Sequence, residues 1–256
     1  MFVNYESLKM DVVGKSVEKP TGGTLSGHAA GEPFDKLVNE FIKKQFPNCT
    51  YRQYEYLNFL FSKNKDAQTV EARNRLFESP TMLFLLDRGK NAVERWSLDN
   101  LFEEKQNDTA DILVTEAGKY ELIDVKTRNL DKKAQPPNII SAFKLAQTCA
   151  KMIDNNDFEL FDINYFQVDW RLEGNRLVCR DAYYAELFKC NPEELYINWA
   201  AAMQIQFHVD ELKQNFINKN REEWARRYLK HFTTEAKRRA EIMIEKFVRP
   251  FEKYLK

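Results

Sequence analysis

Two carboxylates and one lysine occur in this chain with the types and spacing that metal-assisted hydrolysis requires. Asp111 lies on one apolar stretch, and Asp124-Val125-Lys126 lies on the next. Successive side chains of a β-strand alternate between faces, so Asp124 and Lys126 should point the same way. Asp111 on the neighbouring strand can place its carboxylate beside Asp124, and two such groups repel unless a cation joins them. The pattern predicts a divalent cation site, with Mg²⁺ as the natural occupant because it takes hard oxygen ligands.

The same residues indicate a reaction. Asp111, Asp124 and the backbone carbonyl of Val125 are the candidate metal ligands. A bound Mg²⁺ can polarise a phosphoryl group and lower the pKa of a water. Lys126 has two roles open to it: an ammonium orients the water and stabilises developing charge, whereas a lysine of depressed pKa accepts the water's proton. The adjacent carboxylates favour the ammonium and a nearby metal opposes it. We predict phosphodiester hydrolysis, with Asp111, Asp124 and Lys126 as catalytic residues.

Chance is the alternative explanation for the Asp-x-Lys triplet. Such triplets are common, and a hairpin with exposed charges often has no function. The context of Asp124 favours chemistry, because this residue interrupts the apolar run Leu122-Ile123-Asp124-Val125. Burying an unpaired carboxylate costs several kcal/mol, and a metal ion would offset that cost.

The strands that must position these residues can be predicted from periodicity. Residues 109–127 place apolar stretches on either side of a polar segment that contains Gly118, which predicts a β-hairpin with charges at one end. Alternating apolar residues predict further strands over 163–170, 176–180 and 205–209.

Helical spacing of apolar residues predicts the elements around these strands. A first helix covers 34–42 and follows Pro33, a favourable residue at a helix start. A second begins near Asn138 and turns the apolar residues of 139–153 inward. A third, either one long helix or a pair, runs through 220–250. Together the elements predict an α/β fold with a mixed central β-sheet flanked by helices.

Length and composition favour one soluble unit. The chain has 256 residues, of which 43% are hydrophobic, so a single domain over 1–256 is expected. Residues 1–30 look irregular and are expected either to form an N-terminal arm or to pack on the surface. No stretch approaches the ~20 apolar residues that span a bilayer, and the N-terminus lacks a basic region followed by an apolar one. We infer no membrane partner and a cytoplasmic location.

Composition also excludes several kinds of site. The four cysteines are far apart and the three histidines lack metal-ligand spacing, so we interpret them as reduced thiols and structural residues. The formal net charge of zero argues against indiscriminate coating of nucleic acid, whose affinity comes from neutralising phosphates. A local basic cleft is compatible with that balance. Arg128, Lys132 and Lys133 follow the carboxylates, and a second basic set lies between 226 and 239.

Asp111, Asp124 and Lys126 also fit the PD-(D/E)xK pattern of nucleases, with Ala110 where the common form has proline. Residues 23–34, 100–111 and 194–203 resemble the HincII-type family of type II restriction endonucleases, and the likeness spans nearly all of the chain beyond its start. The resemblance implies a restriction-endonuclease-like core. It also implies a Mg²⁺-dependent homodimer that recognises GTYRAC in double-stranded DNA and cuts both strands centrally, leaving blunt ends, within a restriction-modification system. A two-fold dimer brings one hydrolytic centre to each strand of a palindrome.

The resemblance further implies residues that contact DNA bases. The loop with Gln135 and Asn138 resembles the family segment that approaches the centre of the site from the minor groove. The alternative is a helix N-cap for Asn138 and a solvated Gln135. The segment with Tyr196, Asn198 and Ala202 resembles the major-groove reader, with Asn198 as the first choice for a base contact. Degeneracy at the central YR pair is consistent with indirect readout of a flexible step.

Lys90, Thr127 and Arg128 are candidate phosphate contacts, and Glu32 is a candidate supporting group. The sequence leaves two alternative functions open. One is a repair or structure-selective nuclease of the same fold, and the other is a catalytically silent DNA-binding module. The intact Asp111, Asp124 and Lys126 argue against the silent module.

Overall fold

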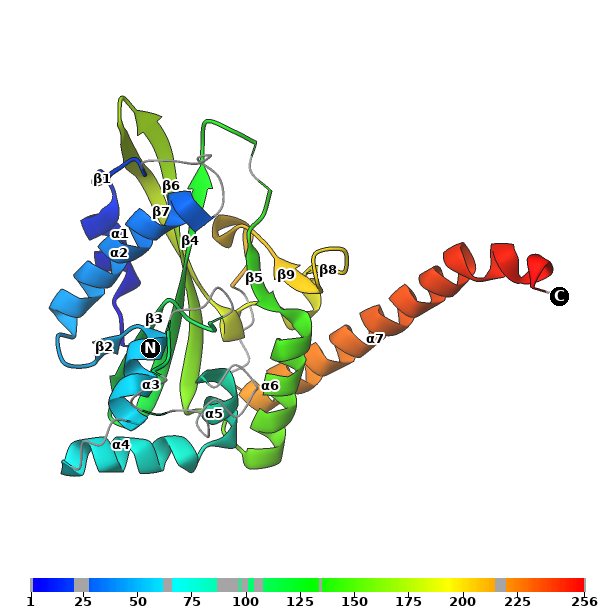
Figure 1. Cartoon of the computed structure of the whole chain (residues 1–256), viewed down its shortest axis with the longest axis horizontal. Helices are drawn as coiled ribbons and strands as arrows, with labels where there is room; N and C mark the ends of the chain where they lie inside the picture. Colours follow the sequence, from blue (N-terminus) through cyan, green and yellow to red (C-terminus); the bar gives the residue numbers. More distant parts are fainter. Residues whose placement is uncertain are drawn as a thin grey trace.

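The centre of the computed structural model is a six-stranded mixed sheet (Figure 1). Its strands, in spatial order, are β1 (Ser16–Glu18), β7 (Arg176–Glu186), β6 (Phe161–Glu173), β4 (Lys119–Asn129), β3 (Ile112–Glu116) and β2 (Thr50–Tyr51). β4 and β6 run parallel, and the other neighbouring pairs of this sheet are antiparallel. The structure describes residues 2–20, 28–61, 66–86, 97, 101–103, 108–133, 135–214 and 220–255. The predicted mixed central sheet is confirmed.

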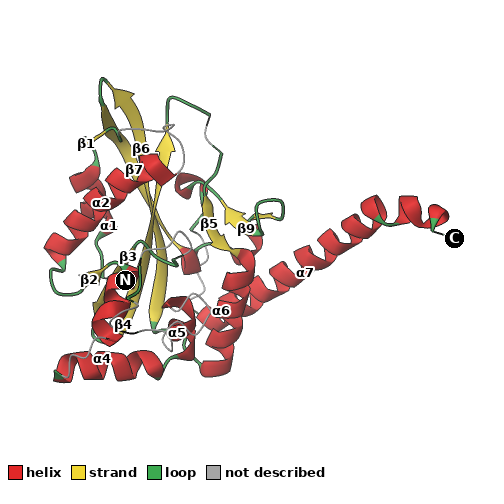
Figure 2. Cartoon of the chain, viewed as in Figure 1, coloured by secondary structure: helices red, strands yellow, loops and turns green. Residues whose placement is uncertain are grey.

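Helices cover both faces of this sheet (Figure 2). One face carries α1 (Tyr5–Val12) and α2 (His28–Gln45). The other carries α3 (Gln53–Phe61), α4 (Ala67–Phe77), α5 (Pro80–Leu86), α6 (Ala142–Asn155) and the first part of α7 (Arg221–Phe247). A small sheet beside α6 has the order β5 (Asn138–Ser141), β9 (Gln204–Gln206) and β8 (Ile197–Asn198). Short 3-10 helices lie at Leu187–Lys189, Pro192–Glu194, Val209–Glu211 and Arg249–Tyr254.

The hairpin predicted over 109–127 is confirmed as β3 and β4. Ala117 and Gly118 at its tip have φ values of 49° and 78°. A two-residue turn of this kind suits the right-handed twist of the strands that it joins. The register pairs Ile112 with Ile123, so the residue before β3 lies opposite Asp124.

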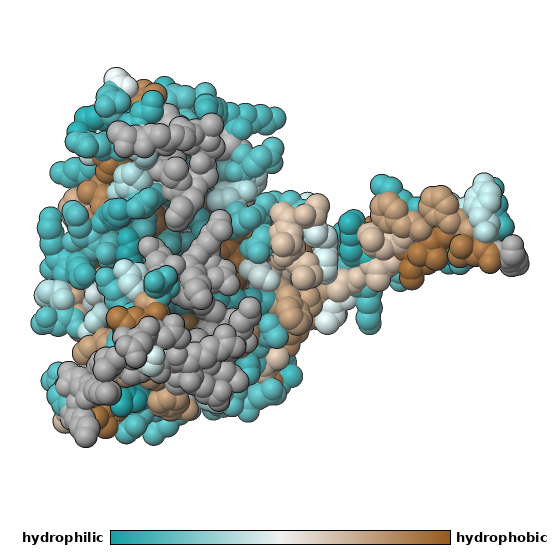
Figure 3. All heavy atoms as spheres, viewed as in Figure 1, coloured by the Kyte–Doolittle hydropathy of each residue, from teal (hydrophilic) through white to brown (hydrophobic). Residues whose placement is uncertain are grey.

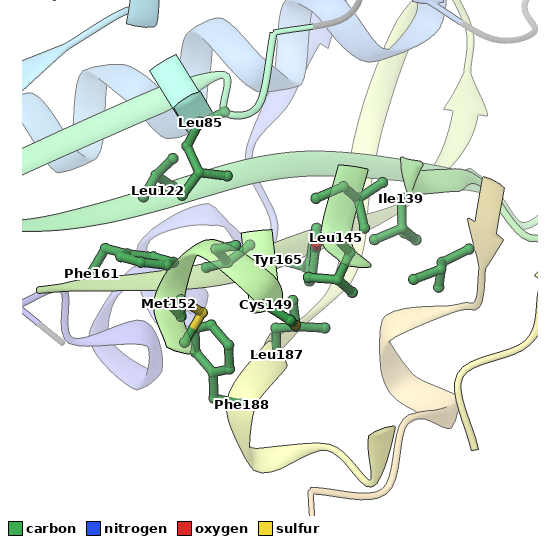
Figure 4. Close-up of a cluster of buried hydrophobic side chains, with 14 of the residues drawn as sticks. Leu85, Leu122, Ile139, Leu145, Cys149, Met152, Phe161, Tyr165, Leu187 and Phe188 are labelled. Atoms are coloured by element: carbon green, nitrogen blue, oxygen red, sulfur yellow. The ribbon is translucent and has the colours of Figure 1, made fainter. Parts of the chain in front are cut away.

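Strand β4 is buried on both faces, which fixes the directions of its side chains. Ile123 and Val125 join Phe34 of α2 in one apolar cluster. Leu122 belongs to the cluster on the opposite face, which Figure 4 shows with Leu85 and residues of α6. Alternation along the strand therefore directs Asp124 and Lys126 towards the face that carries α5 and α6.

The start of α6 differs from the sequence prediction. The helix begins at Ala142 and not near Asn138, because Asn138–Ser141 forms β5 and pairs with β9. The N-cap is Ser141, whose hydroxyl accepts a hydrogen bond from the Lys144 amide at 3.3 Å. Ile139 and Ile140 are β-branched and favour the extended conformation that the small sheet supplies.

The start of α2 also differs. The helix predicted after Pro33 exists, but it begins at His28 and contains Pro33. A proline there removes one backbone donor close to the helix start. Packing of Phe34, Val38 and Ile42 against the sheet outweighs that loss, since all three side chains are fully buried.

The N-terminal segment is regular where the sequence predicted irregularity. Within residues 2–20, α1 packs beside α2 and β1 adds an edge strand to β7. The remaining part of the predicted arm falls largely on residues 21–27, outside the described residues. Local composition missed this order because the contacts that produce it come from a strand more than 100 residues away.

Glu121 of β4 is the group that anchors the N-terminal segment. Its carboxylate accepts hydrogen bonds from the backbone amides of Phe2 and Val3, the latter at 3.1 Å. The Tyr5 hydroxyl donates at 2.6 Å and the Asn164 amide at 2.7 Å. Glu121 is fully buried, so these four donors replace the water that a carboxylate would otherwise keep.

The predicted C-terminal helix is confirmed as α7, with Asn220 as its N-cap. Its first turns are buried through Trp224, but the helix then projects from the body (Figure 1). Met243 and Phe247 of α7 and Phe251 of the following 3-10 helix are exposed. Figure 3 shows hydrophobic surface along this projecting end. No helix within the described ranges is long and apolar enough to cross a membrane.

Candidate active site

The structure brings Asp111, Asp124 and Lys126 together on one face of the β3–β4 hairpin. Asp111 immediately precedes β3, and its Oδ2 accepts a hydrogen bond from the backbone amide of Val125 at 2.7 Å. Asp124 Oδ2 lies 2.7 Å from Lys126 Nζ. Spacing of two along β4 puts both side chains on one face, as the sequence pattern predicted, and there they form this ion pair. Asp124 is 8% exposed, so the two charges meet largely away from solvent.

Burial governs the protonation of this site. Burial raises the pKa of Asp124, Lys126 opposes that shift, and the nearby Asp111 carboxylate adds to it. For Lys126, burial favours the neutral amine, but the carboxylates of Asp124 and Asp111 outweigh burial and the pKa of Lys126 is raised. This electrostatic balance favours the ammonium form of Lys126 over the proton-accepting amine.

The donor set fits a hard divalent cation. Asp124 of β4 and Asp111, just before β3, supply carboxylate oxygens, and a cation between them would remove the repulsion that helps to raise the pKa of Asp124. In the described part of the chain no group of three His, Cys, Asp or Glu side chains is arranged to hold a metal. Mg²⁺ commonly uses one or two protein carboxylates, with waters and substrate phosphate oxygens as its other ligands. Two carboxylates are therefore sufficient, and the Val125 carbonyl stays a predicted third ligand.

A chain of three amides links the two segments that were predicted to read DNA bases. Asn198 Nδ2 of β8 donates to Gln206 Oε1 of β9 at 2.8 Å. Gln206 Nε2 donates in turn to Asn138 Oδ1 of β5 at 2.7 Å. Sequence reasoning missed Gln206, although its position between buried Ile205 and Phe207 indicates a side chain on the other face of the strand.

The side chain of Asn198 also shapes its own turn. Its Oδ1 accepts from the amides of Ala200 at 3.0 Å and Ala201 at 3.2 Å. Ala202 and Met203 then adopt left-handed φ values of 52° and 56°. A bidentate contact with adenine needs an acceptor and a donor from the same amide, so it would require the Asn198 oxygen to leave this turn.

The other predicted base contacts lie at the surface. Gln135 and Asn138 are exposed, and Asn138 does not cap a helix because it lies in β5. Tyr196 is 63% exposed, as a residue that reaches a ligand must be. Trp199 stacks on Phe232 of α7 with ring centroids 6.1 Å apart, in agreement with a packing role.

The candidate phosphate contacts differ in their surroundings. Arg128 forms ion pairs with the carboxylates of Asp169 and Asp210, the latter at 2.9 Å, so its charge is already compensated. Thr127 is half-buried on β4. Lys90 lies outside the described residues. Glu32, the candidate supporting group, forms an ion pair with Lys36 one helical turn away at 2.6 Å.

Comparison with known proteins gives consistent matches. A model of the HincII restriction endonuclease family matches residues 8–255. The type II restriction enzyme HindII of Haemophilus influenzae strain Rd is 63% identical over 251 residues, which cover 98% of this chain and 97% of that enzyme. The type II restriction enzyme HincII of Haemophilus influenzae is 62% identical with the same coverage. The solved NlaIV restriction endonuclease shares 9% identity over 91% of this chain and 86% of that one, with a TM-score of 0.35, which is too low to bear on the fold.

Proposed function

The chain belongs to the HincII family of type II restriction endonucleases, and we propose that it cuts both strands of duplex DNA at GTYRAC in a Mg²⁺-dependent reaction. Cleavage is central and leaves blunt ends. The observation that carries the proposal is the Asp124–Lys126 pair at 2.7 Å beside Asp111, at one end of a hairpin. Identity above 60% with two restriction enzymes over nearly the full chain supports it.

Each residue of the site has a defined task in phosphodiester hydrolysis. A bound Mg²⁺ supplies charge neutralisation at the phosphoryl group and a more acidic water. Asp124 of β4 and Asp111, just before β3, would hold that ion, with the Val125 carbonyl as a further ligand. Lys126, as an ammonium, orients the attacking water and stabilises the charge that develops on the phosphoryl oxygens while the phosphorus–oxygen bond breaks. The raised pKa of Lys126 supports this cationic role.

Digestion of a sequenced plasmid tests the proposal against its rivals. With Mg²⁺ we expect a small set of discrete fragments whose ends map to the centre of GTYRAC, and with EDTA we expect intact plasmid. Cutting at branches without sequence preference would favour a repair or structure-selective nuclease. Specific binding without strand scission in Mg²⁺ would favour the silent DNA-binding module.

Base recognition is proposed to depend on the two amide-bearing segments, with Gln135 and Asn138 in one and Tyr196, Asn198 and Ala202 in the other. The small sheet holds both segments, since Asn138 lies in β5 and Asn198 in β8. Thr127, Arg128 and Lys90 are proposed phosphate contacts. The ion pairs of Arg128 with Asp169 and Asp210 imply that it would have to share or exchange partners to bind a phosphate.

Gln206→Leu is expected to reduce sequence discrimination. The change removes the middle amide of the Asn138–Gln206–Asn198 chain, so the side chains of Asn138 and Asn198 can take other orientations. Each base contact contributes about 1–3 kcal/mol of discrimination, so the ratio of cleavage rates for GTYRAC and singly substituted sites should fall roughly 10- to 100-fold. Gln204→Leu, two residues away on the same face of β9, is the matched control. Equal ratios in both variants would remove Gln206 from recognition.

A homodimer is proposed as the active form, because a palindromic site presents the same phosphodiester chemistry on both strands. The projecting C-terminal end supports this, since Met243 and Phe247 of α7 and Phe251 of the following 3-10 helix expose apolar surface, and such surface marks interaction sites. Analytical ultracentrifugation should give a dimer on one duplex. We place this activity in the cytoplasm, where a restriction-modification system meets its DNA.

A further inference from the structure

Arg52, just before α3, and Gln53, the first residue of that helix, hold the segment that leads into Asp111. We propose that Arg52 and Gln53 are positioning residues for the Asp111 carboxylate. The inference rests on the proposed function, in which Asp111 is a metal ligand. The need for such residues arises because the β3 ladder begins at Ile112, one residue after Asp111. Residues 108–111 therefore lie outside the β3–β4 pairing, and other groups must hold their backbone in place.

Gln53 fixes the backbone before Asp111. Its side-chain oxygen accepts from the amides of Thr109 at 2.9 Å and Ala110 at 3.2 Å. Its side-chain nitrogen donates to the Leu86 carbonyl at 2.9 Å and to Asp108 Oδ1 at 3.3 Å. A glutamine amide offers two donors and two acceptor sites, and all four are used here. Gln53 is 1% exposed, so water cannot replace these bonds without opening the structure.

Arg52 fixes the backbone at Asp111 itself. Its NH1 group donates to the Asp111 carbonyl at 3.1 Å. The same group donates to both oxygens of Asp35 on α2, at 2.8 and 2.6 Å. Asp35 therefore neutralises and orients the guanidinium of Arg52. Through Arg52 it connects the Asp111 backbone to α2, which lies on the opposite face of the sheet.

The consequence is a carboxylate whose position is set from three sides. Gln53 holds the amides that precede Asp111, Arg52 holds its carbonyl, and the Val125 amide holds its Oδ2. Mg²⁺ demands near-ideal octahedral geometry and tolerates little displacement of a ligand. Groups that orient metal ligands in this way typically change metal affinity or activity about 10- to 100-fold when they are removed.

Asn58 offers a matched control on the same helix. Its side chain donates to the Phe102 carbonyl at 2.8 Å and accepts from the Phe102 amide at 2.8 Å. This arrangement uses the same chemistry as Gln53 but holds a different segment. Asn58→Leu should therefore lower the stability of the fold, as the loss of such hydrogen bonds does, without displacing Asp111.

The test compares Gln53→Met with Asn58→Leu and the unaltered protein. We expect the Mg²⁺ concentration for half-maximal cleavage to rise about 10- to 100-fold in Gln53→Met only, with partial recovery of the rate at high Mg²⁺. Independently of activity, calorimetric titration with Mn²⁺ should show weaker binding, and the Thr109 and Ala110 amides should exchange hydrogen faster. Thermal unfolding reports how far each variant stays folded.

Unchanged Mg²⁺ dependence and unchanged Mn²⁺ binding in a folded Gln53→Met variant would overturn the inference. If that variant does not fold, the Arg52→Gln/Asp35→Asn double variant decides by the same measurements, since it removes the guanidinium without leaving a lone buried carboxylate. Failure of the proposed function looks different: the unaltered protein would then cleave without added metal or would not cleave at all. Mn²⁺ binding would still report on the positioning of Asp111.

Discussion

Replacing Lys126 with methionine is expected to reduce cleavage of GTYRAC duplexes by roughly 10²- to 10⁴-fold, the range expected when a group acting on the transition state is lost. Methionine keeps most of the volume of the side chain but removes the charge that lies 2.7 Å from Asp124. Circular dichroism and DNA binding in Ca²⁺ should change little. Lys119→Met, at the exposed start of the same strand, is the control.

The pH dependence of the unaltered protein distinguishes the two roles of Lys126. Burial lowers the pKa of Lys126, but the carboxylates of Asp124 and Asp111 outweigh burial and raise it, so in the absence of a metal ion the side chain stays charged through neutral pH. A charge-stabilising lysine therefore gives no lysine step in the rate between pH 6 and 9. A rate that climbs with pH because the neutral amine is needed would assign it the role of base.

Near-normal cleavage by the Lys126→Met variant would contradict the first prediction and place the reaction elsewhere in the chain.

Replacing Glu121 with leucine is expected to lower the free energy of unfolding by about 3–5 kcal/mol, since a buried donor left without an acceptor costs about 1–3 kcal/mol. Four donors lose their partner: the amides of Phe2 and Val3, the Tyr5 hydroxyl and the Asn164 side chain. Urea denaturation measures the loss, and Glu121→Gln, which keeps one acceptor oxygen, should lose less.

Glu116→Gln is the control for Glu121, because Glu116 is an exposed acidic residue at the end of β3. It should shift stability by less than about 0.5 kcal/mol, as surface changes usually do. The fraction of Glu121→Leu that folds should cleave at close to the normal rate, because Glu121 and Asp124 face opposite sides of the sheet. A stable Glu121→Leu variant would show that the N-terminal segment contributes little to the fold.

Glu121 and Asp124 also show how far a sequence can be interpreted. Both carboxylates interrupt the apolar run of β4, and each is buried and therefore needs a partner. Periodicity gives their faces correctly. It also indicates Lys126, two residues away on the same face, as a neighbour of Asp124, but it does not identify the start of the chain as the partner of Glu121. Local pairs are visible in a sequence, whereas contacts across more than 100 residues are not.

The same distinction accounts for the other predictions. The hairpin over 109–127 and α7 have strong local patterns, and the structure confirms them. Asn138 follows two prolines, which is typical of a helix start. In the structure it lies in β5 instead, because this segment pairs with the distant strand β9. Alternation indicates the face on which Gln206 lies but does not identify its partners, and Arg52 and Gln53 had no local pattern that marked them. Their importance comes from the groups that the fold brings within reach, which are side-chain amides for Gln206 and backbone groups for Arg52 and Gln53.

Glu121 and Asp124 are separated by an odd number of positions along β4, so they face opposite sides of the sheet, and this limits where chains of this family can differ in length. Inserting or deleting one residue between them would reverse the direction of one carboxylate, because strand side chains alternate. The reactive group would then point towards α2, or the anchor of the N-terminus would point towards the active site. Homologous chains should therefore vary in length at the turn near Gly118 or within loops, and keep the segment from Glu121 to Lys126 free of gaps.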